Sequence, residues 1–200
     1  YERDLGQKDL NAHLILPIQR PPRYVLLFKE MLRFTKPTHP DRPAQQRMLA
    51  LYETVCTEMN EQKRSRDQVA EVKRVYDILE GSKPKLTDDP NRALFGEGTF
   101  THFEEENDAL KKRHYYLMSD ILIVAETKKS PTSKHRMRFG IALDTARVEL
   151  KADGSYFLGQ ECLYAFIVHS PTKSHLFLCE TADEKTQLCA AIEKAKQHRK

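Results

Sequence analysis

The sequence predicts an α+β protein in which a helical part, residues 1–81, is joined by a linker, residues 82–91, to a β-rich part, residues 92–200. Apolar residues recur every three or four positions as far as Gly81, which is a helical spacing. The next stretch, "EGSKPKLTDDPNR", combines glycine and proline with polar residues, as helix ends and linkers do. Beyond it, short runs rich in β-branched and aromatic residues alternate with turn residues, which predicts strands.

The first helix is predicted within the stretch "LILPIQRPPRYVLLFKEMLRFT", residues 14–35. Its apolar residues follow the i, i+3, i+4, i+7 pattern of one buried face, formed by Tyr24, Leu27, Phe28, Met31 and Leu32. A separate basic face carries Lys29, Arg33 and Lys36. The prolines at positions 17, 21 and 22 are expected to precede the helix and bend the chain, because proline removes a hydrogen bond from a helix interior.

A second and longer helix is predicted from Asp41, a suitable capping residue, to Glu80. Such a helix would be roughly 60 Å long at 1.5 Å per residue. The seam of residues spaced by three or four along it is apolar at both ends and polar at Gln62 and Arg66. We therefore expect the helix to leave one packed body near that point and to join another.

Seven strands are predicted in the β-rich part, in the runs "ALFGEGTFTHF", "ALKKRHYYLM", "DILIVAE", "RMRFGIALD", "ARVELK", "LYAFIVHS" and "SHLFLCE". Turns follow one another closely, which indicates an antiparallel barrel or sandwich. The final segment, "TADEKTQLCAAIEKAKQH", predicts a closing helix. Thr181 and Glu184 form a capping box at its start, and its apolar stripe consists of Leu188, Ile192 and Ala195.

Charge and hydropathy exclude several functional classes. The 33 basic and 29 acidic residues give a net charge of +4 and mostly alternate, without the clustered basic patch of a nucleic-acid-binding protein. Nucleic acid is therefore not expected as a partner. No apolar run approaches the roughly 20 residues of a membrane span, and no signal-peptide pattern stands at the start, so we expect a cytosolic location.

Neither a metal site nor a cofactor site is expected. Cys162, His169, His175 and Cys179 are separated by six, five and three residues, which matches no zinc finger or ribbon. The four cysteines lack a C-x-x-C pair and are expected to be reduced thiols. Because nucleophile motifs and a phosphate-binding glycine loop are also missing from the sequence, we expect no bond chemistry.

The stretch "LILPIQRPPRYVLLFKEMLRFT", with "MNEQK" further on, resembles the last conserved segment and final helix of a Dbl-homology (DH) domain. DH domains are the exchange domains of Rho-family guanine nucleotide exchange factors. The β-rich part, which contains "RHYYLMSDILIVAE", resembles the pleckstrin-homology (PH) domain that typically follows. Together the resemblances cover nearly the whole chain in the family's order. They imply the C-terminal helices of a DH bundle, followed by a PH-like barrel or sandwich with a capping helix.

The resemblance also implies a binding surface for a Rho-family small GTPase. In the family, the lysine of "LLxKE" and the asparagine of the "NE" pair approach the second switch region, and they correspond here to Lys29 and Asn60. Arg33, one turn beyond Lys29, completes the predicted GTPase-binding set. Arg20 and Arg23 are expected to have a structural role beside the prolines, bonding backbone carbonyls and helix acids.

A phosphoinositide site is the second candidate. PH domains that bind these lipids use a K/R-x-R pair in the second strand, which Lys111 and Arg113 match, and Lys128 and Lys129 of the next hairpin could add attraction. The three glutamates at 104–106 stand where the family pattern has positive charge and would repel a phosphate. Solvated basic residues are therefore favoured over specific headgroup recognition.

The predicted function is that of part of an exchange factor that binds the GTPase switch region and stabilises the nucleotide-free state. It is expected at the inner face of the plasma membrane, with the PH domain docking to lipid or protein. The alternative is an adaptor that does not exchange nucleotide and whose PH domain binds phosphoinositide or protein. These residues alone are expected to exchange poorly, because only the end of the DH domain is present. They are also expected to self-associate through Leu27, Phe28 and Met31.

Overall fold

Of the 200 residues, the computed structural model describes 13–81, 85–127, 134–152, 154–157 and 160–198. The chain forms two compact units, Tyr1–Ser65 and Arg66–Lys200. Helix α3 (Arg42–Ile78) runs from the first unit into the second, and the division falls beside Arg66. This is the polar point of the seam where the sequence predicted that the helix would leave its first packed body.

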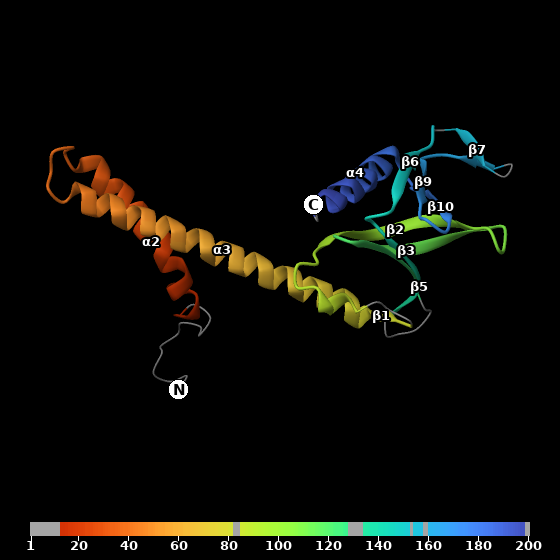
Figure 1. Cartoon of the computed structure of the whole chain (residues 1–200), viewed down its shortest axis with the longest axis horizontal. Helices are drawn as coiled ribbons and strands as arrows, with labels where there is room; N and C mark the ends of the chain where they lie inside the picture. The colour runs from red at the N-terminus through yellow and green to blue at the C-terminus, as the bar shows by residue number, and fades with distance from the viewer. Residues whose placement is uncertain (1–12, 82–84, 128–133, 153, 158–159, 199–200) are drawn as a thin grey trace. The chain divides into compact units, whose positions relative to one another are not determined.

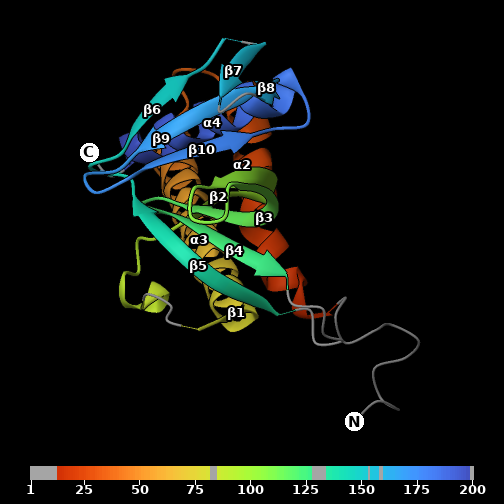
Figure 2. The same ribbon diagram turned by 90° about the vertical axis from the view of Figure 1, so that its right-hand side faces the viewer.

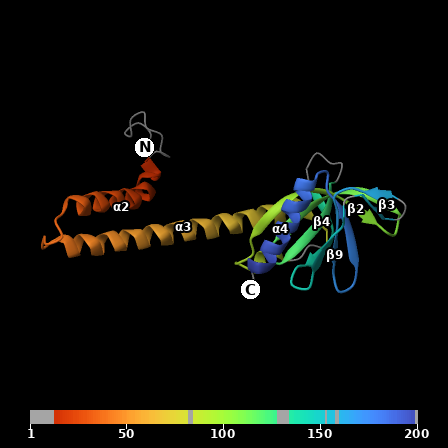
Figure 3. The ribbon, with the colours of Figure 1, turned by 90° about the horizontal axis from the view of Figure 1, so that it is seen from above.

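In the first unit, α2 (Leu16–Phe34) lies antiparallel beside the first part of α3, as Figure 3 shows. Aromatic rings join the two helices. The ring centroid of Tyr52 on α3 lies 5.0 Å from that of Tyr24 and 5.8 Å from that of Phe28. Offset and tilted aromatic contacts of this kind each stabilise a pair of elements by about 0.5–1.5 kcal/mol beyond the area they bury.

The connection between the two helices is closed by Arg42, the first residue of α3. Its guanidinium donates hydrogen bonds to the carbonyl oxygens of Leu32, at 3.0 Å, and of Thr35. The N–H of Thr35 in turn donates to the carbonyl of Met31 at 2.9 Å. Carbonyl groups at the end of a helix have no partner within it, so the side chain of Arg42 satisfies groups that α2 cannot satisfy itself.

The prediction that all three prolines precede the helix is wrong for two of them. Pro17 lies in the first turn of α2, but Pro21 and Pro22 lie inside the helix. Each of the two removes one bond to a carbonyl four residues earlier. These lost bonds fall close to the N-terminal end, so the apolar run that follows still forms uninterrupted helix.

The apolar face of α2 is only partly covered within the described residues. Tyr24 and Phe28 are half-buried against α3, whereas Leu27 is 57% and Met31 47% exposed. Phe34, at the end of the helix, is 78% exposed. Large exposed apolar faces commonly mark surfaces that meet another element or partner. The predicted self-association through this face stays a prediction.

The second unit is built on one eight-stranded sheet with the order β1-β5-β4-β3-β2-β10-β9-β6, seen in Figure 2. Neighbouring strands pair antiparallel except β1 and β5, which are parallel. The strands of this sheet are β1 (Leu79–Glu80), β2 (Leu94–Glu104), β3 (Ala109–Met118), β4 (Ile121–Thr127), β5 (His135–Ala142), β6 (Arg147–Leu150), β9 (Ala165–His169) and β10 (Ser174–Leu178). A separate hairpin pairs β7 (Ser155–Phe157) with β8 (Gln160–Cys162).

All seven predicted strands are present, and the α+β class is confirmed. Of the two predicted forms, barrel or sandwich, the closed barrel is not formed, because the sheet is open, with β1 at one edge and β6 at the other. Two further features were not predicted. Strand β1 has only two residues at the end of a long helix, too few to form an alternating pattern. The β7–β8 hairpin lies between the predicted strands "ARVELK" and "LYAFIVHS", where no strand was predicted.

The end of α3 is packed into the second unit. Val72 and Val75 are buried together with Leu79, and they share a core cluster with residues of β3 and β4. Leu86, in a short 3₁₀ helix (Leu86–Asp88) within the predicted linker, is fully buried in the same cluster. Arg92 fastens the end of this segment, with its guanidinium 2.5 Å from the Asp120 carboxylate. The described part of the linker is therefore anchored to the second unit through Leu86, and Arg92 fixes the chain directly after it.

Helix α4 (Ala182–His198) closes the second unit through the predicted apolar stripe, since Leu188, Ile192 and Ala195 are all buried. The predicted capping box is confirmed with one difference. The N–H of Glu184 donates to Thr181 Oγ1 at 3.2 Å, while the carboxylate of Glu184 accepts from the N–H of Glu180 at 3.0 Å, one residue before the cap. The first bond satisfies an N–H of the first helical turn, and the second satisfies the N–H of a residue just before the helix.

Candidate functional site

The predicted GTPase-binding residues begin with Lys29, on the flank of α2 beside α3. Its Nζ lies 3.0 Å from a carboxylate oxygen of Glu53 on α3, and the two side chains are 54% and 48% exposed. Ion pairs exposed to this degree contribute only about 0–1 kcal/mol to stability. The ammonium group is therefore positioned by Glu53 but remains open to solvent and to a competing carboxylate.

Asn60 lies on the same face of α3 as Glu53. It follows Glu53 by seven residues, which is two helical turns, so the two positions share a face at a distance of about 10 Å along the axis. Asn60 is exposed. Arg33, one turn after Lys29 on α2, is 72% exposed and lies 3.7 Å from Glu30. We call the set Lys29, Arg33, Glu53 and Asn60 the Lys29 surface.

The two arginines expected to have a structural role form contacts within α2. Arg20 Nε donates to the hydroxyl of Tyr24 at 2.6 Å, and Arg23 donates to the side-chain oxygen of Gln19 at 3.2 Å. Backbone carbonyls and acidic side chains were predicted as their partners. That prediction is wrong for these two bonds, which go to neutral side chains. Because Arg23 remains exposed, α2 presents it to solvent as a further cation outside the Lys29 surface.

Two of the residues predicted to bind lipid, Lys111 and Arg113, lie in the second unit and are already paired. The guanidinium of Arg113, 7% exposed, donates to Glu104 and, at 3.0 Å, to Glu126. Lys111 lies 2.7 Å from Glu104. Although burial acts to raise it, the hydrogen bonds from Lys111 and Arg113 hold the pKa of Glu104 at about 2. Glu104 therefore stays charged and occupies both cations, while Lys128 and Lys129 lie outside the described residues.

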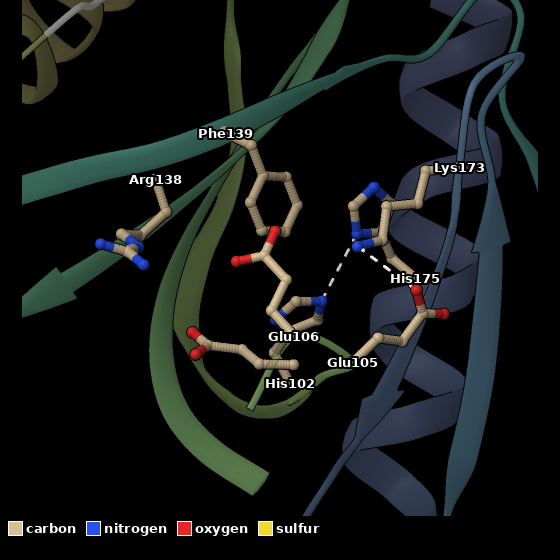
Figure 4. Close-up of a pocket in the computed structure, with 8 residues that line it drawn as sticks. His102, Glu105, Glu106, Arg138, Phe139, Lys173 and His175 are labelled. Carbon is tan, nitrogen blue, oxygen red and sulfur yellow. Dashed lines mark hydrogen bonds and ion pairs between the residues drawn. The ribbon is translucent and has the colours of Figure 1, made fainter. Parts of the chain in front are cut away.

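A cavity of about 300 Å³ lies next to this network, between β2, β5 and β10, and Figure 4 shows the side chains that line it. His102 and His175 meet at its centre, with 3.4 Å between His102 Nε2 and His175 Nδ1. The ring of Phe139 stacks on His175 at 4.4 Å between centroids. Charges of both signs surround the rings, among them Glu105, which lies 3.4 Å from Lys173. The cavity is therefore not a basic pocket, and phosphoinositide binding stays a prediction.

His102 makes the second unit sensitive to acid. It is 95% removed from solvent, and its Nδ1 has no hydrogen-bond partner among the described residues. Burial first, and then the nearby His175, lower its pKa from 6.5 to about 4. Its neutral form is thus strongly preferred in the folded protein, whereas the unfolded chain takes up the proton near pH 6.5.

We expect the free energy of unfolding to fall as pH drops from 6.5 to about 4, since only the unfolded state binds this proton there. One histidine of this kind contributes a slope of up to about 1.4 kcal/mol per pH unit. Urea denaturation at a series of pH values measures the slope. The His102→Gln variant should show a shallower slope. A slope equal to that of the unsubstituted chain would assign the loss of stability in acid to His114, His135 and His175, because burial also lowers their pKa values.

Neither the Lys29 surface nor the cavity around His102 resembles a site for bond chemistry or metal binding. Among the described residues, no group of three His, Cys, Asp or Glu side chains is placed to hold a metal ion. Burial raises the pKa of both Cys179 and Cys189 to about 11, so these thiols are weak nucleophiles. In the described part of the chain, no helix is both long and apolar enough to span a bilayer.

Comparison with known proteins shows the relatives of this chain. Residues 2–60 match the family model of the RhoGEF domain. The chain is 25% identical to the phosphatidylinositol 3,4,5-trisphosphate-dependent Rac exchanger 1 protein of Mus musculus, over 95% of this chain and 12% of that protein. It is 32% identical to Rac guanine nucleotide exchange factor B of Dictyostelium discoideum, over 66% of this chain and 11% of that protein. The chain thus spans only a small part of the length of these relatives.

Solved structures share the fold. A structure of inhibitor-bound Vav1 matches with a TM-score of 0.75 and 16% identity, over 95% of this chain and 48% of that one. The DH/PH domains of PDZ-RhoGEF, solved in complex with activated RhoA, match with a TM-score of 0.61 and 16% identity, over 96% of this chain and 57% of that one. At such identities the likeness shows the fold alone. It confirms the predicted α+β fold class, which matches that of solved DH/PH structures.

Proposed function

We propose that this chain, the last part of a RhoGEF (DH) domain followed by a PH-type unit, is a segment of a guanine nucleotide exchange factor for Rho-family small GTPases. The observation that carries the proposal is the match of residues 2–60 to the RhoGEF family model, continued by relatives named as Rac exchangers over nearly the whole chain. Its place in the cell would be the cytoplasmic face of the plasma membrane.

The proposed activity requires binding and no covalent step. An exchange factor binds the nucleotide-free GTPase more tightly than the loaded form. By thermodynamic linkage it then weakens nucleotide binding by the same factor. Nucleotide release follows from a shift in population and needs no nucleophile, general base or cofactor. The surface required is one that offers exposed, well-positioned polar groups to a partner.

The Lys29 surface has these properties. Lys29 is held by a single exposed carboxylate, so a carboxylate of the partner can replace Glu53 at little energetic cost. Asn60 can both donate and accept, which suits contact with backbone groups of a GTPase switch segment. Arg33 extends the same flank with a fork of donors that matches carboxylates. The surface combines charge with hydrogen-bonding capacity on two helices joined by aromatic packing.

The proposal is tested by measuring the rate of nucleotide release from a panel of Rho-type GTPases. The assay uses a protein that contains this chain within a complete RhoGEF domain. Lys29→Ala and Asn60→Ala are each expected to slow exchange about tenfold, the effect of losing roughly 1.4 kcal/mol of contact. Lys36→Ala removes an exposed cation beyond the end of α2 that is not assigned to the GTPase contact, and it is expected to change the rate less than about twofold.

Different outcomes separate the function from its site. If the parent protein accelerates no GTPase, the exchange function is wrong and the adaptor alternative gains support. If exchange occurs and Arg23→Ala slows it while Lys29→Ala does not, the function holds and the contact lies at Arg23, outside the Lys29 surface. Equal unfolding midpoints for the variants would show that the rates report binding and not folding.

A further inference from the structure

Half of strand β2 has a free edge. On one side, β2 pairs with β3 over its length, but on the other side β10 reaches it only at Thr101 and His102. Among the residues that the structure describes, no strand adjoins residues 94–100 on that side. In an antiparallel strand, alternate residues direct their N–H and C=O groups away from a given neighbour. This segment therefore offers backbone donors and acceptors to a further strand.

A groove runs along this free edge. It has a volume of about 480 Å³ and lies between β2 and α4, which are neighbours in Figure 1. Its apolar lining comes from β2, β3 and α4 and consists of Phe95, Tyr115, Leu117, Leu188 and Ala191. Proteins bind extended peptides as added strands through two features, which are unpaired backbone groups and apolar side chains beside them. We call this feature the edge groove.

Two glycines shape the floor of the edge groove. A Cβ on Gly98 would come within 3.0 Å of the Tyr115 ring, so the glycine allows that ring to lie against the strand. A Cβ on Gly96 would meet no atom within 4 Å. The space above Gly96 is therefore empty on the groove side, and a side chain from a partner strand would fit there without displacing protein atoms.

The opposite face of the same strand segment is acidic. Glu97, 44% exposed, accepts a hydrogen bond from Arg74 at 2.8 Å, and Arg74 also donates to Glu71 at 2.9 Å. Two carboxylates thus share one guanidinium, which leaves a net negative charge beside the free edge. Side chains on neighbouring strands interact when they lie on the same face of the sheet. A basic residue of an added strand would be favoured next to Glu97.

We propose that the edge groove binds an extended peptide of a partner protein as an additional strand on β2. The peptide has alternating aliphatic and basic residues. Its aliphatic side chains enter the groove above Gly96, and its basic side chains meet Glu97 on the other face, because successive residues of a strand point to opposite faces. The site lies wholly within the second unit and does not depend on the exchange function.

The test uses the 200-residue chain and a synthetic peptide of about eight alternating valine and lysine residues, the length of an ordinary strand. Amide chemical shifts in NMR spectra follow the titration. The amides of residues 95–99 and of α4 are expected to shift saturably. Gly96→Leu fills the groove and is expected to weaken binding at least about tenfold, whereas Ala142→Leu, which adds nearly as much bulk at an exposed position of β5, changes affinity less than about twofold.

Two control peptides separate backbone pairing from charge attraction. Proline in place of an inner valine removes a backbone donor and should abolish binding. Glutamate in place of lysine should weaken it through repulsion by Glu97. The proposal is overturned if no saturable shifts appear up to about 1 mM peptide. A dissociation constant of about 1 mM corresponds to a binding free energy of only about 4 kcal/mol. It is also overturned if the Gly96→Leu variant binds the peptide with unchanged affinity. A third contrary result is a dimer of the peptide-free chain that Gly96→Leu dissociates, since the groove would then hold a second copy of the chain.

Discussion

Replacing Arg113 by alanine is expected to lower the free energy of unfolding of the second unit by about 3 kcal/mol, because it removes one of the two cations that pair with the largely buried Glu104 carboxylate. Arg113 is 7% exposed and joins Glu104, 12% exposed, to Glu126. Lys111 still neutralises Glu104 in the variant, so the loss should fall at the low end of values for broken buried pairs.

Urea denaturation measures this loss, with Lys111→Ala as the matched control. The Lys111 side chain is 41% exposed, and its removal is expected to cost about 1 kcal/mol or less. The difference should also depend on pH. Glu104 has its pKa lowered to about 2, so the stability that it supplies is present above about pH 4.5 and is lost as pH falls toward 2. Equal losses for the two variants at neutral pH would contradict a structural role specific to Arg113.

Replacing Phe177 by alanine is expected to destabilise the second unit by about 3–5 kcal/mol, the range for deleting a buried phenylalanine. Phe177 is fully buried on β10, and its ring centroid lies 4.4 Å from that of Phe100 and 5.4 Å from that of Phe166. The change leaves a cavity at the junction of two aromatic contacts. Collapse around it is limited because β2 and β9 are both fixed by their pairing with β10.

Phe34→Ala is the control for this prediction, since the same atoms are removed from a side chain that is 78% exposed. Its cost is expected to be within about 0.5 kcal/mol. The chain contains no tryptophan, so circular dichroism is the suitable probe for both unfolding curves. A loss below about 1 kcal/mol for Phe177→Ala would show that the core rearranges to fill the space.

The second unit was predictable from its sequence because each long strand carries its own signal. Residues such as Ile121 to Val124 form a short apolar run bounded by turn residues, and all seven predicted strands are present. Sheet closure is a different kind of property. It depends on whether strands at the two edges meet, and no local pattern in β1 or β6 encodes that contact.

The candidate sites show the same limit. Spacing could place Lys29 and Asn60 on helices, but the pairing of Lys29 with Glu53 joins residues 24 positions apart and depends on how the helices pack. The two-residue K-x-R pattern of Lys111 and Arg113 gave no sign that Arg113 is buried between Glu104 and Glu126. The free edge of β2 could not be predicted, because it exists only where β10 ends and the chain turns into α4.

The middle of α3 has a consequence for local stability. Residues 60–67 are all exposed, so neither unit's core holds this stretch of helix. Its helical form depends on intrinsic propensity, since glutamate, glutamine, lysine and arginine predominate, and on weak neighbouring charges such as the Glu61–Arg64 pair at 3.8 Å. Helix without tertiary support opens at a low free energy and loses order as temperature rises. The segment between the two units is therefore the part of α3 in which amide hydrogens exchange with solvent first.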